Sequence, residues 1–315
     1  MRMHARNLYY AIRPFIPRTL QIYARRAWCK IMRLQYHGVW PIDPRAGKLP
    51  RDWPGWPDGK QFGLILTHDV DTLGGLKRCR QLADLDLELG FRSSFNFVPE
   101  RYPMDASVHG YLNDRGFEIG VHDLNHDGKL LSSRTIFADR AVKINGYLKQ
   151  WNAVGFRAAA MHHNLEWFRM LNIEYDLSTF DTDPFEPQCD GVGTIFPFWV
   201  GTPGIDNGYW EIPYTLPQDF TTFVLMGERT IDLWKRKLAW VVDRGGLALV
   251  NAHPDYMAFQ PNEQTIENYP VSLYRDFLQH VKATYAKRYW HGLPKDLVRH
   301  CRTSMRSVER KAGNL

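Results

Sequence analysis

Hydrophobic and polar positions divide the chain from Gln61 onward into alternating strand-like and helix-like segments. Short, continuously apolar runs such as residues 62–67 (FGLILT) and 247–251 (LALVN) are typical of strands that are buried on both faces. Between such runs, apolar residues recur every three or four positions, which is typical of amphipathic helices. The pattern predicts strands at residues 62–67, 93–98, 117–122, 154–159, 174–179, 209–214 and 247–251, and helices at residues 74–89, 132–151, 164–171 and 230–244.

Seven strands with intervening helices predict an α/β fold built on a parallel sheet, either closed into a barrel or open. A further helical region follows residue 251. In both arrangements the chemistry lies at the carboxyl ends of the strands. Polar residues that directly follow the predicted strands are therefore the first candidates for a functional site.

The N-terminal part of the chain differs from the rest in charge and composition. Residues 1–42 contain eight Lys and Arg residues and no Asp or Glu. Residues 39–59 form a connector whose prolines exclude a regular helix or central strand, and whose tryptophans predict packing against the main domain. We expect residues 1–60 to form a basic arm and connector, and residues 61–315 to form the main domain with C-terminal helices.

Apolar residues in the arm recur at helical spacing and predict a basic amphipathic helix. Such a helix can lie in the interface of an anionic membrane, where each Lys or Arg contributes roughly 1 kcal/mol. The alternative is that its apolar face packs on the main domain or on a second subunit. The apolar positions are Leu20, Tyr23, Ala27, Ile31 and Leu34, and Arg25, Arg26, Lys30 and Arg33 surround them.

Composition narrows the class of protein. Apolar residues make up 44% of the 315 positions, enough for a core, which excludes wholesale disorder. The net charge of +6 suits nucleic acid, anionic lipid or an acidic glycan, but no nucleic-acid-binding module is recognisable, so we expect no nucleic-acid partner. The four cysteines are scattered, no run of 18 apolar residues occurs, and no convincing secretory signal is present. We expect a cytoplasmic protein, with peripheral membrane attachment through the arm as one alternative.

The first polar cluster is THDVD, residues 67–71, at the end of the first predicted strand. Because side chains alternate along a strand, Asp69 and Asp71 point to the same side. Two adjacent carboxylates repel each other and are costly to desolvate, and a metal ion would offset both effects. The alternative is a loop in which the aspartates cap the next helix.

The second cluster is HDLNH, residues 122–126, directly after another predicted strand. The i, i+4 spacing on a helical turn would place His122 and His126 on one face. Two imidazoles so placed can hold one zinc ion at about 2.0–2.1 Å.

Two further strand ends carry candidate residues. Arg157 lies among small and apolar neighbours, and a buried arginine needs a carboxylate partner, which Asp69 or Asp71 can supply. His253 follows the last predicted strand, as either a hydrogen-bonded structural residue or a catalyst. His163 adds a polar group near Arg157. An Asp-His-His metal site with an open position, a second Asp as base and a His as acid form one hydrolytic mechanism.

These motifs, in this order, resemble those of the polysaccharide-deacetylase family (NodB-like, carbohydrate esterase family four), and the resemblance covers roughly residues 60–260. The family's first motif, usually TFDDG, is similar to THDVD, with Val70 at the usual metal-ligand position and Asp71 matching a D-x-D subgroup. The second motif, H-[ST]-x-x-H, matches HDLNH with Asp123 in place of Ser or Thr. The third, R-x-P-[YF], keeps its arginine but has Ala159 and Ala160 in place of the proline and the aromatic residue. The fifth, L-x-x-x-H, matches LVNAH.

The resemblance implies a distorted (β/α)7 barrel and a role for each matched residue. A divalent metal, with zinc expected, would be held by Asp71, His122 and His126. The catalytic residues would be Asp69 as general base, Arg157 as the group that orients it, and His253 as general acid. We expect His163 and Asp183 to contact substrate. The aspartate of the fourth motif, which orients the catalytic histidine, would be Asp176, Asp181 or Asp183.

The implied activity is hydrolysis of the N-acetyl group of an amino sugar, in a bacterial surface polysaccharide or its lipid-linked precursor. Residues 181–200 resemble a variety of the family found among bacterial surface-polysaccharide proteins. The alternatives are deformylation or O-deacetylation on the same barrel, and a glycan-binding domain without turnover.

Overall fold

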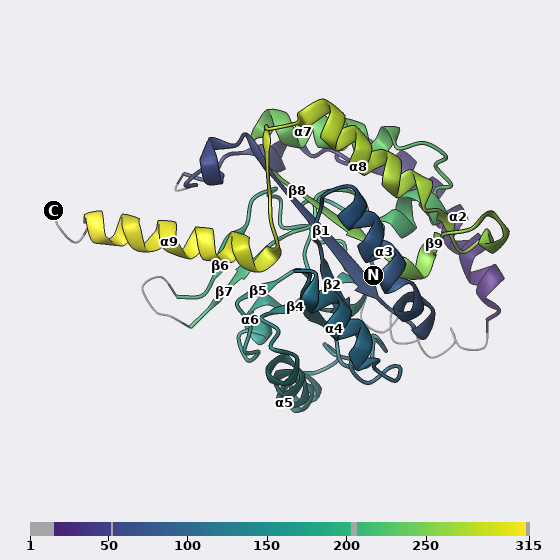
Figure 1. The fold of residues 1–315 in the computed structure, drawn as a ribbon, viewed down its shortest axis with the longest axis horizontal. Coiled ribbons are helices and arrows are strands. Elements are labelled where there is room, and N and C mark those ends of the chain that lie inside the picture. Colours follow the sequence, from purple (N-terminus) through teal and green to yellow (C-terminus); the bar gives the residue numbers. More distant parts are fainter. Residues whose placement is uncertain (1–15, 52, 203–206, 313–315) are drawn as a thin grey trace.

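The computed structural model describes residues 16–51, 53–202 and 207–312. At its centre is a curled sheet in which eight strands run parallel and β6 pairs antiparallel with β7 (Figure 1). The strand order is β11-β1-β2-β3-β4-β5-β7-β6, with β8 on the other side of β1. The strands are β1 (Phe62–Val70), β2 (Ser94–Phe97), β3 (Glu118–His122), β4 (Gly155–Arg157), β5 (Tyr175–Asp176), β6 (Phe198–Val200), β7 (Tyr209–Glu211), β8 (Leu247–Ala252) and β11 (Tyr289–His291).

The sheet curls until its two ends meet. The segment after β7 returns to β8, where the carbonyl oxygen of Leu249 accepts backbone hydrogen bonds from Thr215 N at 3.2 Å and Leu216 N at 3.1 Å. The contact closes the sheet without a regular ladder. The prediction of an α/β fold with a distorted barrel is confirmed.

Alternation along β1 sets the inner and outer faces of the barrel. Leu64 and Leu66 pack outward in the large core beneath the helices, whereas Ile65 lies in the inner cluster. Continuing the alternation, Thr67 and Asp69 face inward. Because every residue of β1 is buried, its sequence is a continuous apolar run until the polar residues at its carboxyl end.

Helices cover the outer face of the barrel (Figure 1). Ser133 caps α5 by accepting a hydrogen bond from Ile136 N. The helices of the main domain are α3 (Leu73–Glu88), α4 (Ala106–Asp114), α5 (Arg134–Trp151), α6 (Leu165–Phe168), α7 (Asp232–Arg244), α8 (Ser272–Tyr285) and α9 (Pro294–Ala312). Two short strands, β9 (Met257–Ala258) and β10 (Tyr269–Pro270), pair separately.

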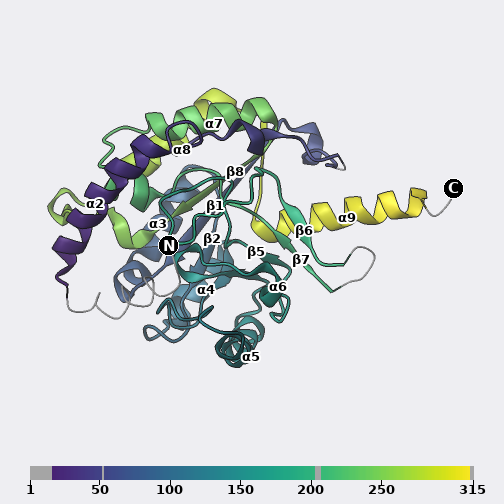
Figure 2. The same cartoon turned by 180° about the vertical axis from the view of Figure 1, so that it is seen from behind.

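The arm contains the predicted helix, α2 (Arg18–Gln35), and Figure 2 shows it running along the side of the domain beside the π-helix that spans Phe220–Leu225. The side chains of Ile22 and Cys29 are buried in the large hydrophobic core of the main domain. In the connector, Trp40 and Trp56 are buried, and Trp56 Nε1 donates to Gly245 O at 2.8 Å, as the predicted packing requires.

The predicted apolar face of α2 does not pack on the barrel. Leu20, Tyr23, Ile31 and Leu34 are 54–78% exposed, and Ala27 is also exposed. The helix docks through a different side, on which Ile22, Cys29 and Met32 lie. Arg2, Arg6 and Arg13 of the predicted arm lie outside the described residues.

Helix α9 leaves the barrel at the opposite side and projects away from it (Figures 1 and 2). Its first turns are anchored, because Leu297, Val298 and Cys301 are buried in the inner cluster. Within the part of the chain that the structure describes, no helix has the length and apolar character needed to cross a bilayer.

Candidate metal and catalytic centre

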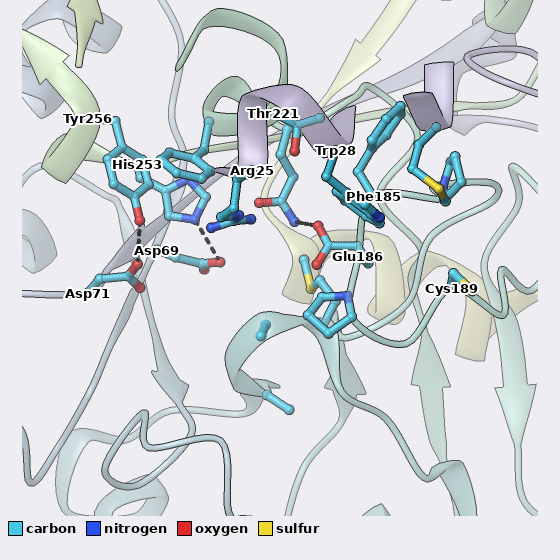
Figure 3. A pocket seen from close by; sticks show the side chains of 18 of the residues that line it. Arg25, Trp28, Asp69, Asp71, Phe185, Glu186, Cys189, Thr221, His253 and Tyr256 are labelled. Carbon is cyan, nitrogen blue, oxygen red and sulfur yellow. Dashed lines mark hydrogen bonds and ion pairs between the residues drawn. The ribbon is translucent and has the colours of Figure 1, made fainter. Parts of the chain in front are cut away.

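A cavity of about 700 Å³ opens at the carboxyl ends of the barrel strands. Figure 3 shows Asp69, Asp71 and His253 at one end and Trp28, Phe185 and Glu186 towards the other. Helix α2 supplies part of the wall, so residues from outside the barrel also contribute to the cavity.

Three potential metal ligands converge in this cavity. Asp71 directly follows β1, His122 ends β3, and His126 lies four residues further on. Asp71 Oδ1 lies 3.3 Å from His122 Nε2 and 3.2 Å from His126 Nε2. The two imidazole rings are 4.9 Å apart between centroids. The structure thus brings together the three residues that the sequence suggested as ligands.

The donor atoms fit one divalent ion. Ligands at about 2.0–2.1 Å from a tetrahedral zinc lie roughly 3.3 Å from each other, which is the spacing of these atoms. Among the described residues, the buried Asp71 Oδ1 has no hydrogen bond of good geometry, although the two imidazole Nε2 atoms lie close to it. A buried carboxylate oxygen without a well-directed donor is costly, and a cation removes that cost. Two nitrogens and one carboxylate oxygen are a donor set that zinc accepts.

The proton positions on the two histidines differ. His122 Nδ1 donates to Arg157 O at 3.0 Å, which leaves the lone pair of Nε2 directed at the proposed ion. His126 Nδ1 lies 2.6 Å from Arg101 Nη1 and must accept there, because a guanidinium only donates. Ligation through His126 Nε2 requires a proton on Nδ1, and Arg101 would then keep only its bond to His126 O, at 3.2 Å.

The segment between the two histidines is a loop, so the predicted helical turn is wrong. Asp123 and His126 have φ values of 58° and 54°, which a helix does not allow. Asp123 accepts from the next backbone N–H, of Leu124, and its own N–H bonds to Arg157 O at 2.8 Å. The strained loop, not helical periodicity, brings the imidazoles together.

Asp69 is held by a set of donors inside the barrel. Its Oδ1 accepts from Arg157 Nη1 and Asn96 Nδ2, both at 2.9 Å, and its Oδ2 accepts from Asn251 Nδ2 at 3.0 Å. Arg157 is fully buried. Although burial favours the neutral acid, the Arg157 guanidinium and the neighbouring histidines hold the pKa of Asp69 below its usual range. The carboxylate is therefore ionised at neutral pH.

His253 follows β8 and reaches the cavity beside Asp69, with Nε2 3.8 Å from Asp69 Oδ2. Its Nδ1 lies 2.7 Å from Asp219 Oδ1. Although burial opposes the charged imidazolium, Asp219 and the site carboxylates raise the pKa of His253 to about 10. His253 is thus protonated at neutral pH.

The residue that orients His253 is Asp219, so the expectation of Asp176, Asp181 or Asp183 is wrong. Asp219 also accepts from His253 N at 2.7 Å and Tyr269 OH at 2.9 Å. Of the three expected residues, Asp176 bonds to Ser178, Asp181 pairs with Lys237, and Asp183 accepts from Tyr214. Each carboxylate has a partner remote from His253.

The two residues expected to contact substrate are not among the residues that line the cavity. Asp183 is buried and accepts from Phe185 N and Tyr214 OH. His163 exchanges hydrogen bonds with Gln188 through its backbone. Neither side chain lines the cavity, so their substrate-binding role stays a prediction.

Sequence reasoning missed several residues of the site. Asn96 and Asp219 each sit in an ordinary-looking segment, and only the fold shows which side chain each one holds. For Asp219 a usable signal existed: it follows the predicted strand that precedes the His253 strand, and neighbouring strand ends adjoin. The cavity residues of α2 gave no such signal, since the arm lies outside the family motifs.

Comparison with known proteins identifies the fold. No family model matches the sequence, and no curated protein is similar enough in sequence to match. Three similar solved structures are a putative polysaccharide deacetylase from Mycobacterium smegmatis, a probable polysaccharide deacetylase from Pseudomonas aeruginosa PAO1, and PuuE allantoinase. Their identities are 19%, 13% and 13%, and their TM-scores 0.60, 0.58 and 0.61. The matches cover 79%, 83% and 83% of this chain and 93%, 97% and 97% of the others.

The chain therefore has the fold of the polysaccharide deacetylases, as the motifs predicted. At sequence identities of 13–19%, the structural similarity shows the fold and not the activity. Since an allantoinase shares the fold, the activity of this chain has to be argued from its own site.

Proposed function

We propose that the protein is a metal-dependent hydrolase that removes the N-acetyl group from an amino sugar of a bacterial surface polysaccharide or its lipid-linked precursor. One observation carries the proposal: a carboxylate and an imidazole, those of Asp69 and His253, lie beside a converging Asp-His-His set in one cavity. This arrangement suits the hydrolysis of an amide, which needs a proton acceptor for water and a proton donor for the amine.

The residues that would hold the ion are Asp71, His122 and His126. A divalent metal bound there, with zinc the expected species, would polarise the acyl carbonyl and lower the pKa of water. Only three protein ligands converge among the described residues, which leaves room for substrate, as in catalytic zinc sites.

The proton transfers of the reaction are carried out by side chains of the protein. Arg157 and Asn251 hold Asp69 in place. Asp69 accepts a proton from the attacking water while the oxygen of that water bonds to the carbonyl carbon. His253 then gives its Nε2 proton to the amine nitrogen as the C–N bond breaks. The products are acetate and a free amino sugar. Asp219 keeps Nδ1–H in place, so that Nε2 is the nitrogen that faces the reaction.

The sequence motifs and the fold support a carbohydrate substrate, and aromatic residues of the cavity, Trp28, Tyr36 and Phe185, offer flat faces to a sugar ring. The acyl group is tested by incubating the metal-loaded protein with N-acetylated, N-formylated and O-acetylated sugars and measuring acetate and formate. Acetate from N-acetyl sugars supports the proposal. Formate only, or acetate from esters only, favours the two rival hydrolases, and binding without release favours a non-catalytic glycan-binding domain.

We also propose that α2 attaches the protein peripherally to an anionic membrane at the cytoplasmic face. The support is that its apolar positions, among them Ile31 and Leu34, face solvent and not the barrel. Lys30 is exposed on the same helix, whereas Arg26 and Arg33 are bonded to the protein. The apolar side chains would therefore contribute more than charge does. A membrane position would bring the cavity, which α2 also lines, close to lipid-linked substrate.

A further inference from the structure

Helix α2 places two arginine side chains, Arg18 and Arg25, on the wall of the cavity. Figure 3 shows Arg25 between His253 and Glu186, and both Arg25 and the metal-ligand set line the same space. The guanidinium carbon of Arg25 lies 4.8 Å from the centre of the Phe220 ring, so the side chain rests on an aromatic face that holds it in position.

Arg25 differs from the other arginines of α2 in having no bonded partner. Arg18 pairs with Glu267 at 3.3 Å and Arg33 with Glu228 at 2.7 Å. Arg26 donates to two backbone carbonyls, each at 2.9 Å. Within residues 16–51, 53–202 and 207–312, Arg25 forms neither an ion pair nor a hydrogen bond. Its five N–H donors are available to a ligand.

The carboxyl group on the far side of Arg25 does not neutralise it. Glu186 Oε1 accepts from Gln218 Nε2 at 2.8 Å and from Tyr214 OH at 3.3 Å. Burial, with the nearby Asp183 carboxylate, raises the pKa of Glu186 to about 8. The hydrogen bonds of Glu186 therefore go to other groups, and among the described residues no carboxylate forms an ion pair with Arg25.

We propose that Arg25 binds an anionic substituent, a carboxylate or a phosphate, on the acylated amino sugar. The inference rests on the proposed function and narrows its substrate class from N-acetyl sugars in general to acidic or phosphorylated ones. A guanidinium pairs with either group through two parallel hydrogen bonds, and such charge-assisted bonds are the strong ones. Arg25 acts as a specificity residue, and it lies outside every catalytic motif.

Binding to metal-loaded full-length protein, measured by calorimetry, tests the inference without requiring turnover. The probes are N-acetylglucosamine, N-acetylglucosamine 1-phosphate and an N-acetylhexosaminuronic acid. Wild type is expected to bind at least one of the charged sugars roughly tenfold or more tightly than the neutral sugar, the scale of a charge-assisted bond. Whether the phosphate or the carboxylate shows the preference identifies the source of the anion.

The variant Arg25→Gln is expected to bring the charged-to-neutral affinity ratio close to one, and Arg25→Lys to lower it partly, since an ammonium lacks the planar fork. Arg33→Gln, on the same helix but outside the cavity, should keep the wild-type ratio. Equal affinity of wild type for all three sugars, or an unchanged ratio in Arg25→Gln, would overturn the inference. An Arg25-dependent preference without acetate release would uphold it and count against the proposed hydrolysis instead.

Discussion

Asp219 controls the protonation of the proposed general acid. It accepts from both Nδ1 and the backbone N–H of His253, at 2.7 Å each, and is itself fully buried. Such a carboxylate fixes the imidazole tautomer and stabilises the imidazolium. His253 owes both its orientation and its raised pKa to this neighbour.

Asp219→Asn keeps the shape of the side chain and removes its charge, so the pKa of His253 should fall. His253 acts in its protonated form, and its activity is lost as pH rises through its pKa. In the pH profile of kcat/KM, we expect the alkaline limb of the wild type to lie well above neutral pH. The alkaline limb of Asp219→Asn is expected to lie at lower pH. Tyr269→Phe removes one hydrogen bond to Asp219 but leaves its charge, and should shift the limb much less. Identical alkaline limbs in wild type and Asp219→Asn would exclude His253 as the acid.

The metal content of purified variants distinguishes a residue that binds the ion from the residue that acts as general base. Asp71→Ala and His122→Ala should lose the ion, because each removes one of three converging donors. Asp69→Asn should keep it and the fold, yet lose turnover by several orders of magnitude. Elemental analysis of the purified proteins, together with acetate release, makes the comparison. Loss of metal from Asp69→Asn would mean that the two aspartates have been given each other's roles.

Glu118 offers a test of electrostatics far from the site. The carboxyl group accepts from Tyr175 OH at 2.8 Å, and burial raises its pKa to about 7 from 4.5. A raised carboxyl pKa means that stability is lost as pH rises from about 4.5 to about 7, because ionisation is then costlier in the folded state.

Glu118→Gln should therefore gain stability over wild type as pH rises, by about 3 kcal/mol at pH 8, a value that follows from 1.36 kcal/mol per pKa unit. Little difference is expected near pH 4. Thermal unfolding across this range measures the trend, and Glu88→Gln, at an exposed position, serves as the matched control. A stability difference that does not change with pH would contradict the assigned pKa.

At the scale of residues, local motifs predicted Asp69, Asp71, His122, His126, Arg157 and His253, which the structure brings into one region. Asp71, His122, Arg157 and His253 could be found because each directly follows or ends a strand, and Asp69 and His126 because each shares a short motif with one of them. Asn96 could not be singled out, since polar residues within strands are common and its partner lies elsewhere in the chain. Asp219 could have been found from its place after the predicted strand that precedes the His253 strand.

Strands were predictable as elements because a parallel sheet buries both faces. Residues 62–67 and 247–251 correspond to β1 and β8, whose residues are all buried. By contrast, β11 is only half-buried, and α4 is a short helix that buries two side chains, Val108 and Leu112, so neither pattern stood out. The helical turn predicted for HDLNH failed because i, i+4 spacing also occurs in a loop with positive φ angles.

Helix α2 was predicted correctly as an element, but the side on which it packs could not be read from its sequence. Its most apolar stripe is exposed, and the helix is anchored by Ile22, Cys29 and arginine side chains that bond to the domain. Hydrophobic periodicity identifies an amphipathic helix but not the partner of its apolar side.

If α2 attaches to a membrane, replacing its exposed apolar side chains should abolish the attachment. Ile31→Glu combined with Leu34→Glu should leave the fold intact, since both side chains are exposed, and should move the protein to the supernatant in sedimentation with anionic liposomes. Thr19→Glu, which adds charge at another exposed position of the helix, is the control. Equal sedimentation of wild type and the double variant would refute attachment through this face.

In the whole molecule, the barrel and the N-terminal arm supply different parts of the cavity. The barrel supplies the metal-ligand set, Asp69 and His253 from strand ends, and the arm supplies the cavity wall with Arg25. The barrel was predictable, because its motifs recur in a fixed order. The joint cavity was not, because it depends on where α2 docks.

Metal-dependent hydrolysis at the Asp71–His122–His126 site can be measured as acetate release from an N-acetylated sugar while metal is added back to chelator-stripped protein. The stripped protein should be inactive, and activity should rise with added zinc and level off near one ion per chain. Undiminished acetate release by the metal-free protein would show that the hydrolysis does not depend on metal.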